Sequence, residues 1–402
     1  MKTVSRRRRA LLVVENLPVP FNRRVWLEAT TLARHGYEVS VICPKSSNAT
    51  RAFEVLADVH IYRYSMPLEA GSGALGYLVE FSWCFMATAW LSLRVAAFGR
   101  GFDVLHACNP PDTFWLLGRF WRLFGVRYIF NHHDLAPEMF AAKFGRQAGF
   151  FYRALLWLER QSMATARAVI TTNESYKRVA IERDGKKPED VFIVRSGPAL
   201  HELPVFPRDK IYFGGKEHLL VYLGEICKQD GVEYMVRAVK LLNEEFGRKD
   251  VRCLFVGGGP HQPVVKAYAE EVGIMDFCEF TGRIGDEDLC RILSSATLGI
   301  DPDPKNEWSD KSTMNKVIEY MYFGLPVVAF DLHETRVSAG AAGAYAEANS
   351  ERDMARIIAE LLDDPERRAR MGELGRQRVR EALAWDYSVA PLLAAYDRAL
   401  SN

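Results

Sequence analysis

The residue types and the spacing between residues 312 and 336 point to an anion-binding site. Ser312 and Thr313 are good N-cap residues for a helix, and the backbone N–H groups at a helix start bind anions. Lys316, in the first turn of that helix, adds a point charge suited to phosphate. Glu319 lies about one turn further on, where its carboxylate could bind hydroxyl groups of the molecule that carries the phosphates.

The elements that must position these side chains are a short helix and a buried strand. The helix is expected to begin at Asn315 and to be ended by Gly324 and Pro326. The apolar run 327–330 then has the composition of a strand that is buried in a parallel sheet. The alternative is an ordinary amphipathic helix, capped by Ser or Thr, that leads into a strand and binds nothing.

A second group of polar residues follows the predicted strand 127–130. Open α/β sheets bind their ligands at the carboxyl ends of their strands, and His132, His133 and Asp134 stand at such an end. Two adjacent histidines cannot face the same way there, so one of them is expected to face a ligand. We predict that this residue is His133, with Asp134 placed to fix its tautomer. A purely structural histidine is the alternative.

Length and composition describe an ordinary soluble globular protein of two domains. The chain has 402 residues, of which 49% are hydrophobic and 26% charged. The net charge of +1 implies no nucleic-acid partner. The seven cysteines are scattered and form no Cys-x-x-Cys pair, which indicates free thiols in a reducing compartment and argues against zinc. The apolar run 10–14 is too short for a signal peptide and is predicted to be a strand.

Strand and helix patterns alternate along both halves of the chain, which predicts two parallel α/β sheets. In the first half, strands are expected at 10–15, 38–43, 61–64, 103–107, 127–130, 168–172 and 191–195, and a helix at 22–35. In the second half, strands are expected at 219–223, 251–256, 277–281, 297–300 and 327–330, and helices at 351–362, 365–382 and 387–400. Proline and glycine between residues 196 and 215 mark a linker.

The segment 75–98 is an unusually apolar helix pattern of nearly membrane-spanning length. Glu80 lies inside it and a predicted strand follows at once, so we expect a helix of the first domain with an exposed apolar face that contacts a lipid or a membrane. A buried crossover helix is the alternative. The basic run 6–9 is either a second contact to anionic lipid or a solvated chain start.

The segment 312–336 resembles the donor-binding signature of glycosyltransferase family 4, whose members are retaining enzymes of the GT-B fold. In that family a Glu-x-x-x-x-x-x-x-Glu motif is followed by Ala-Met or Tyr-Met and by a Gly-x-Pro-Val-Val turn. Glu319 matches the second Glu, which in the family holds the nucleotide ribose, whereas Lys311 occupies the position of the first. Asp310 is the nearest carboxylate, and we predict that it takes the catalytic part of the missing Glu. The sequence from Ser312 to Met321 resembles a subgroup that builds bacterial surface polysaccharides.

The resemblance also implies a set of donor-binding residues in the second half. In the family, Arg and Lys after the first strand of this half grip the diphosphate, but Glu225 and Asp230 stand there in this chain. Lys228 is the candidate to replace them. The turn after the strand 277–281 lies against the nucleotide base in the family. The predicted donor-binding residues are Gly224, Lys228, Gly258, Arg283, Ser312, Thr313, Asn315, Lys316 and Glu319.

The resemblance covers nearly the whole chain and implies a GT-B architecture of two Rossmann-like domains. Residues 1–203 are expected to form the acceptor domain, with residues 386–402 crossing back to pack on it, and residues 204–385 the donor domain. Family members often carry a His-Asp pair near the donor sugar, which agrees with the choice of His133. The candidates on the acceptor side are Asn22, Arg23 and Glu138.

The implied activity is the transfer, with retention, of a hexosyl or N-acetylhexosaminyl group from a nucleotide-diphosphate sugar to a saccharide acceptor. We expect that acceptor to be lipid-linked and to belong to cell-surface polysaccharide biosynthesis. No cofactor is expected, and no metal, because prolines rigidify the Asp301-Pro302-Asp303 segment. The expected location is the cytoplasm or the cytoplasmic face of the inner membrane. The alternatives are a nucleotide-sugar 2-epimerase of the same architecture and a degenerate, non-catalytic partner subunit.

Overall fold

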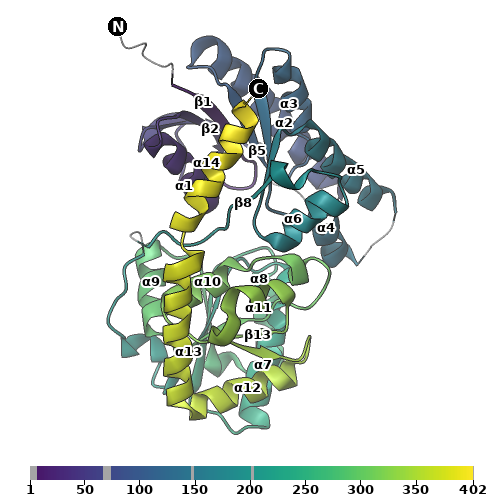
Figure 1. Cartoon of the computed structure of the whole chain (residues 1–402). Helices are drawn as coiled ribbons and strands as arrows, with labels where there is room; N and C mark the ends of the chain where they lie inside the picture. The colour runs from purple at the N-terminus through teal and green to yellow at the C-terminus, as the bar shows by residue number, and fades with distance from the viewer. Residues whose placement is uncertain (1–6, 67–73, 146–148, 201–202, 402) are drawn as a thin grey trace. The chain divides into compact units, whose positions relative to one another are not determined.

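The computed structural model describes residues 7–66, 74–145, 149–200 and 203–401, which fold into two compact units (Figure 1). The first unit comprises Met1–Ala141, Arg146–Arg195 and Ser388–Asn402. The second comprises Ala142–Gly145 and Ser196–Tyr387. Apart from the segment Ala142–Gly145, the chain changes unit after residues 195 and 387, where the sequence predicted 203 and 385.

The first unit is built on an eight-stranded sheet in the order β3-β4-β2-β1-β5-β6-β7-β8. Its strands are β1 (Arg9–Val13), β2 (Glu38–Pro44), β3 (Phe53–Leu56), β4 (Val59–Tyr64), β5 (Val104–Cys108), β6 (Arg127–His132), β7 (Ala168–Thr171) and β8 (Val191–Ile193). Its helices are α1 (Arg23–Arg34), α2 (Ala74–Phe98), α3 (Trp115–Arg122), α4 (Ala136–Phe144), α5 (Phe150–Thr165), α6 (Glu174–Glu182) and α14 (Asp386–Leu400). The strand pairs of the described residues are parallel except for β3 with β4.

The second unit is built on a six-stranded parallel sheet in the order β11-β10-β9-β12-β13-β14. Its strands are β9 (His218–Leu223), β10 (Val251–Val256), β11 (Cys278–Gly282), β12 (Leu298–Asp301), β13 (Val327–Phe330) and β14 (Gly343–Ala346). Its helices are α7 (Val232–Glu244), α8 (Gln262–Glu271), α9 (Asp286–Ser295), α10 (Asn315–Tyr322), α11 (His333–Ala339), α12 (Glu351–Asp363) and α13 (Pro365–Arg378). The prediction of two Rossmann-like domains is confirmed.

Two strands were not predicted from the sequence. β14 pairs with β13, so 327–330 is not the last strand of its sheet, as the sequence suggested. β3 is an antiparallel edge strand with mostly exposed side chains. β14 is rich in small residues and β3 does not alternate between apolar and polar residues, so neither segment carries the hydrophobic pattern of a buried strand.

The C-terminal helix α14 packs with the first unit, as predicted. The ring of Tyr396 meets that of Tyr37 edge to face at 5.3 Å. Asp397 forms an ion pair of 2.6 Å with Arg8, and Arg9 forms one of 2.7 Å with Asp103. Arg8 and Arg9 therefore have partners within the first unit. The lipid contact of the basic run 6–9 stays a prediction, and Arg6 lies outside the described residues.

Tyr320 fastens α10 to the second sheet. Its hydroxyl donates to the carbonyl of Ile300 at 3.1 Å and accepts from the backbone N–H of Leu223 at 2.7 Å, so one side chain connects the helix to β12 and β9. Its ring lies over Gly299, where an added Cβ would stand 2.3 Å from a ring carbon. Packing therefore requires glycine at this position.

Replacing Gly299 by alanine should destabilise the second unit, because the methyl group would displace a fully buried ring. Overpacking of this kind costs about 1–3 kcal/mol, which urea unfolding of the full chain would register as a lower midpoint. Gly285→Ala is the matched control, since no atom lies within 4 Å of its added Cβ. Equal midpoints for the two variants would contradict this account of Gly299.

Candidate active site

The second sheet reverses its strand order between β9 and β12, which is where open α/β sheets bind their ligands. The turns after β9 and β10 begin with glycines of positive φ, Gly224 at 152° and Gly257 at 127°. A Cβ added at Gly257 would stand 1.9 Å from the carbonyl oxygen of Gly224, so the turns meet backbone to backbone. Gly258 is more open, and the nearest backbone atom to its added Cβ is the nitrogen of Arg283 at 3.8 Å. Three predicted donor residues therefore gather at this edge.

Lys316 reaches the same edge from the first turn of α10, and two buried carboxylates hold its ammonium. Its Nζ contacts Asp303 and lies 3.3 Å from Oδ1 of Asp301. It also lies 5.0 Å from the centre of the Tyr222 ring. Its Cε is 3.5 Å from the Cβ that a side chain at Gly224 would add. The sequence predicted a lysine offered to phosphate, and the structure shows that internal carboxylates already pair with it.

The pKa values of this group are shifted by burial and by mutual interaction. Burial, reinforced by Asp301, raises the pKa of Asp303 well above its ordinary value. Burial opposes the charge on Lys316, but Asp303 and then Asp301 more than compensate, so its pKa is raised well above that of a free lysine. Burial also raises the pKa of Asp230 to about 6, although Lys316 opposes that shift. Lys316 therefore stays positive, while Asp303 and Asp230 retain their protons more readily than usual.

The prediction that Ser312 and Thr313 cap α10 is wrong. The N-cap residue is Met314, whose side chain makes no capping hydrogen bond, and the helix begins at Asn315. The hydroxyl of Ser312 instead donates to the carbonyl of Trp308 at 2.7 Å, because a turn of 3₁₀ helix precedes α10. The other local predictions hold: α10 ends before Gly324, which has a φ of 72°.

Glu319 is half-buried in the second turn of α10, and Asn315 is exposed at its start. These positions agree with the predicted spacing along the helix. The nucleotide contacts assigned to both residues stay predictions. Lys228 is exposed at the first position of a 3₁₀ turn, Lys228–Asp230, and its contact with the diphosphate also stays a prediction.

Asp310 has a structural task that the sequence did not reveal. Its Oδ1 accepts a hydrogen bond of 2.8 Å from the backbone nitrogen of His333, the first residue of α11, and lies 3.5 Å from Nζ of Lys305. Lys311, at the position of the family's first Glu, forms an ion pair of 2.7 Å with Glu307. The hydrogen bond to His333 gives the Asp310 carboxylate a structural role at the start of α11. Its catalytic role stays a prediction.

In the first unit, the two histidines after β6 lie in different surroundings. His132 is fully buried and its Nε2 lies 2.8 Å from Glu159, whereas His133 is only partly buried. Burial and the nearby Arg24 lower the pKa of His133 well below its ordinary value, so this imidazole is neutral near pH 7. This arrangement agrees with the prediction that the two side chains point in different directions.

Asn109, which the sequence did not single out, holds the turn that carries His133. Its Oδ1 accepts from the backbone nitrogens of His133 and Asp134 at 2.9 and 3.1 Å, and its Nδ2 donates to the carbonyl of Asp134 at 2.7 Å. Asp134 was predicted to fix the tautomer of His133, but Nδ1 of that ring has no hydrogen-bond partner among the described residues. Asn109 positions the turn through the backbone instead. Its location at the end of β5, beside β6, was the available signal.

The acceptor-side candidates have structural partners. Asn22 is the N-cap of α1, since its side chain accepts from the nitrogen of Val25 at 3.1 Å. Glu138 is 5% exposed and pairs with Arg183. This ion pair gives Glu138 a structural task, and its acceptor role stays a prediction. Arg23 is half-buried in the first turn of α1, and its acceptor role stays a prediction.

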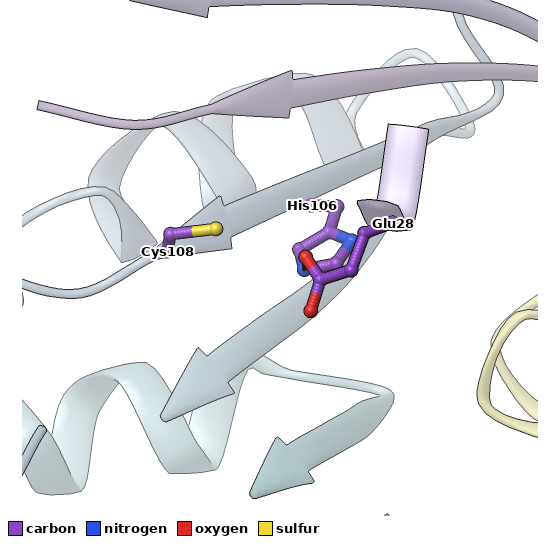
Figure 2. A group of neighbouring side chains, drawn as sticks. All are labelled: Glu28, His106 and Cys108. Atoms are coloured by element: carbon purple, nitrogen blue, oxygen red, sulfur yellow. Dashed lines mark ion pairs between the residues drawn. The ribbon is translucent and has the colours of Figure 1, made fainter. Parts of the chain in front are cut away.

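Glu28 of α1 forms a buried group with His106 and Cys108 of β5, and their potential metal-ligand atoms all lie within 4.8 Å of one another (Figure 2). The Glu28 carboxylate accepts from Nδ2 of Asn131 at 2.8 and 3.0 Å and lies 3.2 Å from Nε of Arg24. Burial, aided by Arg24, lowers the pKa of His106 to about 3, and burial raises that of Cys108 well above its ordinary value. Partners within the protein satisfy the carboxylate, so we assign this group to the core.

Asp112, near the end of β5, provides a test of these electrostatics. It is 3% exposed, and burial raises its pKa to about 7 although His132 opposes the shift. A raised carboxyl pKa favours folding at low pH, and that contribution is lost as the pH rises through the folded value. Asp112→Asn should therefore gain stability relative to the wild type as the pH rises from about 4 to about 7, by a few kcal/mol at most.

Melting temperatures of the two proteins across this pH range would measure the gain. Asp58→Asn is the control, because Asp58 is exposed in a turn and this substitution should shift the melting temperature equally at every pH. A gain for Asp112→Asn that does not depend on pH would contradict the raised pKa.

Comparisons with known proteins agree with this architecture. Residues 21–197 match the model of the "Glycosyl transferase 4-like domain" and residues 217–364 that of "Glycosyl transferases group 1". The chain is similar to a D-inositol 3-phosphate glycosyltransferase of Gordonia bronchialis, with 24% identity over 98% of this chain and 89% of the relative.

Solved structures show the same fold at low identity. A sucrose-phosphate synthase of Thermosynechococcus elongatus aligns with a TM-score of 0.76 and 19% identity, over 97% of this chain and 98% of that one. HepE of Anabaena, solved in complex with UDP, aligns with a TM-score of 0.69 and 14% identity, over 97% and 99% of the two chains. With both halves matched by glycosyltransferase models and both sheets arranged as in these structures, the chain belongs to the GT-B glycosyltransferases of family 4.

Proposed function

We propose that this glycosyltransferase moves a hexosyl or N-acetylhexosaminyl group, with retention, from a nucleotide-diphosphate sugar to a lipid-linked saccharide in the biosynthesis of a cell-surface polysaccharide. The observation that carries the donor part is the position of Lys316. It brings a buried positive charge to the edge where the strand order reverses between β9 and β12, beside the Gly224 turn. UDP, which is bound in the HepE structure, is a donor nucleotide of the required kind.

The diphosphate would meet two kinds of groups at this edge. Backbone N–H groups at the start of α10 supply fixed dipoles, and Lys316 supplies the charge. As the sugar leaves, negative charge grows on the diphosphate, and these fixed groups would stabilise the transition state. The diphosphate would share the ammonium with Asp303, whose raised pKa lets it take up a proton and so reduces charge repulsion. Glu319, one turn along α10, would accept hydrogen bonds from the ribose hydroxyls.

The first unit would contribute the acceptor groups and His133. A neutral imidazole carries no positive charge but can still donate and accept hydrogen bonds. We therefore assign His133 a hydrogen-bonding role during transfer. No cofactor beyond the donor is proposed. We place the enzyme in the cytoplasm or peripherally on the cytoplasmic face of the inner membrane, because the exposed apolar side of α2 suits a lipid-linked acceptor.

The first test is a thermal-shift panel of UDP, GDP, ADP, TDP and CMP, with and without magnesium. A ligand that binds only the folded state stabilises it by about 2.7 kcal/mol at a hundred times its Kd, so one diphosphate should raise the melting temperature. No shift with any of them would overturn the donor assignment and favour a non-catalytic partner subunit. Conversion of a nucleotide sugar in the absence of an acceptor would instead indicate a 2-epimerase.

Glu319→Ala should weaken binding of the stabilising nucleotide by roughly tenfold to a hundredfold, because losing a charged hydrogen-bond partner costs about 1.5–3 kcal/mol. Isothermal titration calorimetry would measure the change in Kd. Glu360→Ala, on the surface of α12, is the matched control and should leave the Kd unchanged. Unchanged affinity in Glu319→Ala would remove the ribose role.

His133→Ala should lower kcat by a larger factor than it changes the Kd for the nucleotide, since His133 belongs to the first unit and the nucleotide site to the second. Because the pKa of His133 is low, its removal should not change the shape of the pH profile between about pH 6 and pH 8. Full activity in this variant would clear His133 of a part in turnover.

A further inference from the structure

Helix α2 exposes several of its large apolar residues, whereas small or polar residues are among those it buries fully. Cys84, Thr88 and Ser92 are fully buried, and the indole N–H of Trp121 donates to the Ser92 hydroxyl at 3.1 Å. The exposed residues include Met86 and Trp90, each 63% exposed. An ordinary surface helix has the opposite arrangement, with polar residues outward. This helix therefore presents a surface made for an apolar environment.

The exposed residues form one continuous stripe along the helix. They recur at intervals of four and three residues, so they lie on one face. We call this set the outer stripe of α2; its members are Val79, Trp83, Met86, Trp90 and Leu93. All five side chains are exposed, and they lie within a stretch, Val79–Phe98, that is only 22% buried and long enough to cross a membrane.

The apolar surface continues at the ends of α2 and α3. β5 and β6 are parallel neighbours, paired from Val104 with Arg127, so the helices that precede them end at the same edge of the sheet. Phe98 is 89% exposed there, and Leu123 and Phe124 are also exposed. Trp121 joins the two helix ends, because its ring lies 5.7 Å from that of Phe124 and its indole bonds to α2.

The topology excludes a transmembrane course for α2 in this fold. The strands before and after it, β4 and β5, belong to one sheet and are connected through β2 and β1. A spanning helix would leave these two strands on opposite sides of a bilayer. The buried side of α2, with Cys84 and Val95, also belongs to the core of the unit. Any membrane contact of this helix must therefore run along the membrane surface, with the outer stripe facing the lipid.

The charges around the outer stripe favour an anionic lipid surface over a second copy of the chain as its partner. Arg94 of α2 and Arg119 and Arg122 of α3 are exposed around the apolar surface, whereas Glu80 is the acidic residue that the described part of these two helices contains. Two copies that met through this surface would bring like charges together. Anionic headgroups would pair with them, at about 1 kcal/mol per arginine. Trp83 and Trp90 also suit the boundary between headgroups and acyl chains.

We infer that the outer stripe of α2, together with Phe98, Leu123 and Phe124, inserts into the headgroup layer of an anionic lipid leaflet and holds the first unit on the membrane. The inference deepens the proposed function, because a lipid-linked acceptor lies in that layer. The test measures binding to vesicles that contain no acceptor and no donor. Membrane binding can therefore fail while the transferase assignment stands, and the transferase assignment can fail while membrane binding stands.

The test is cosedimentation of the full chain with vesicles of phosphatidylcholine alone and of phosphatidylcholine mixed with phosphatidylglycerol. The wild type should sediment with the anionic vesicles, less with the neutral ones, and less again at high salt. The double variant Met86→Glu and Trp90→Glu should bind at least roughly tenfold more weakly, since burying one such side chain is worth a factor of that order. Arg94→Glu with Arg122→Glu should reduce binding to the anionic vesicles only.

The matched control is Ile211→Glu, because Ile211 is 73% exposed and lies in the second unit. It should sediment like the wild type, and circular dichroism should show all variants folded. A wild type that sediments with neither vesicle, or an equal loss in Ile211→Glu, would overturn the inference. Light scattering could also overturn it, by showing that the wild type is a dimer without lipid and that Met86→Glu with Trp90→Glu makes it a monomer. The stripe would then be an interface between two copies of the chain.

Discussion

A buried lysine that shares its charge with two aspartates is the constraint around which the second unit is arranged. Asp301 ends β12 and Asp303 follows two residues later, while Lys316 comes from the next helix, α10. Breaking such a buried pair by removing one partner typically costs about 3–5 kcal/mol, so the strand end and the helix start must stay together. Tyr320 reinforces this arrangement by bonding to both β9 and β12. The start of α10 is thus rigid where a ligand would meet it.

Rigidity of this kind suits the proposed reaction. Groups that are already oriented stabilise developing charge without reorganising during the reaction. The glycine turns serve the same purpose, because Gly224 and Gly257 touch through their backbones and a side chain at Gly257 could not be accommodated. The carboxyl groups around Lys316 moderate its charge, so the proposed diphosphate site presents no isolated cation to the protein interior.

The first unit solves a comparable problem with a more extended network. Arg183 pairs with Glu138 and Glu159, and Glu159 lies against His132. Several charged side chains are therefore buried near the carboxyl ends of the strands, where they neutralise one another. Asn109 fixes the backbone above them. The first unit thus buries charged side chains at one place and exposes large apolar side chains of α2 at another. Ordinary folding favours neither arrangement, and both are common at functional sites and binding surfaces.

The sequence alone determined the elements whose signal is local. The helix at about 22–35, the end of α10 before Gly324 and most strand positions follow from turn chemistry and from hydrophobic period, and the segment 312–336 was enough to indicate the family. The tertiary structure decided how the charged side chains are paired. Glu28 meets Asn131 across 103 residues, and Asp310 caps a helix 23 residues away. Such partners depend on which segments the sheet order brings together, and no periodic pattern in the sequence records that order.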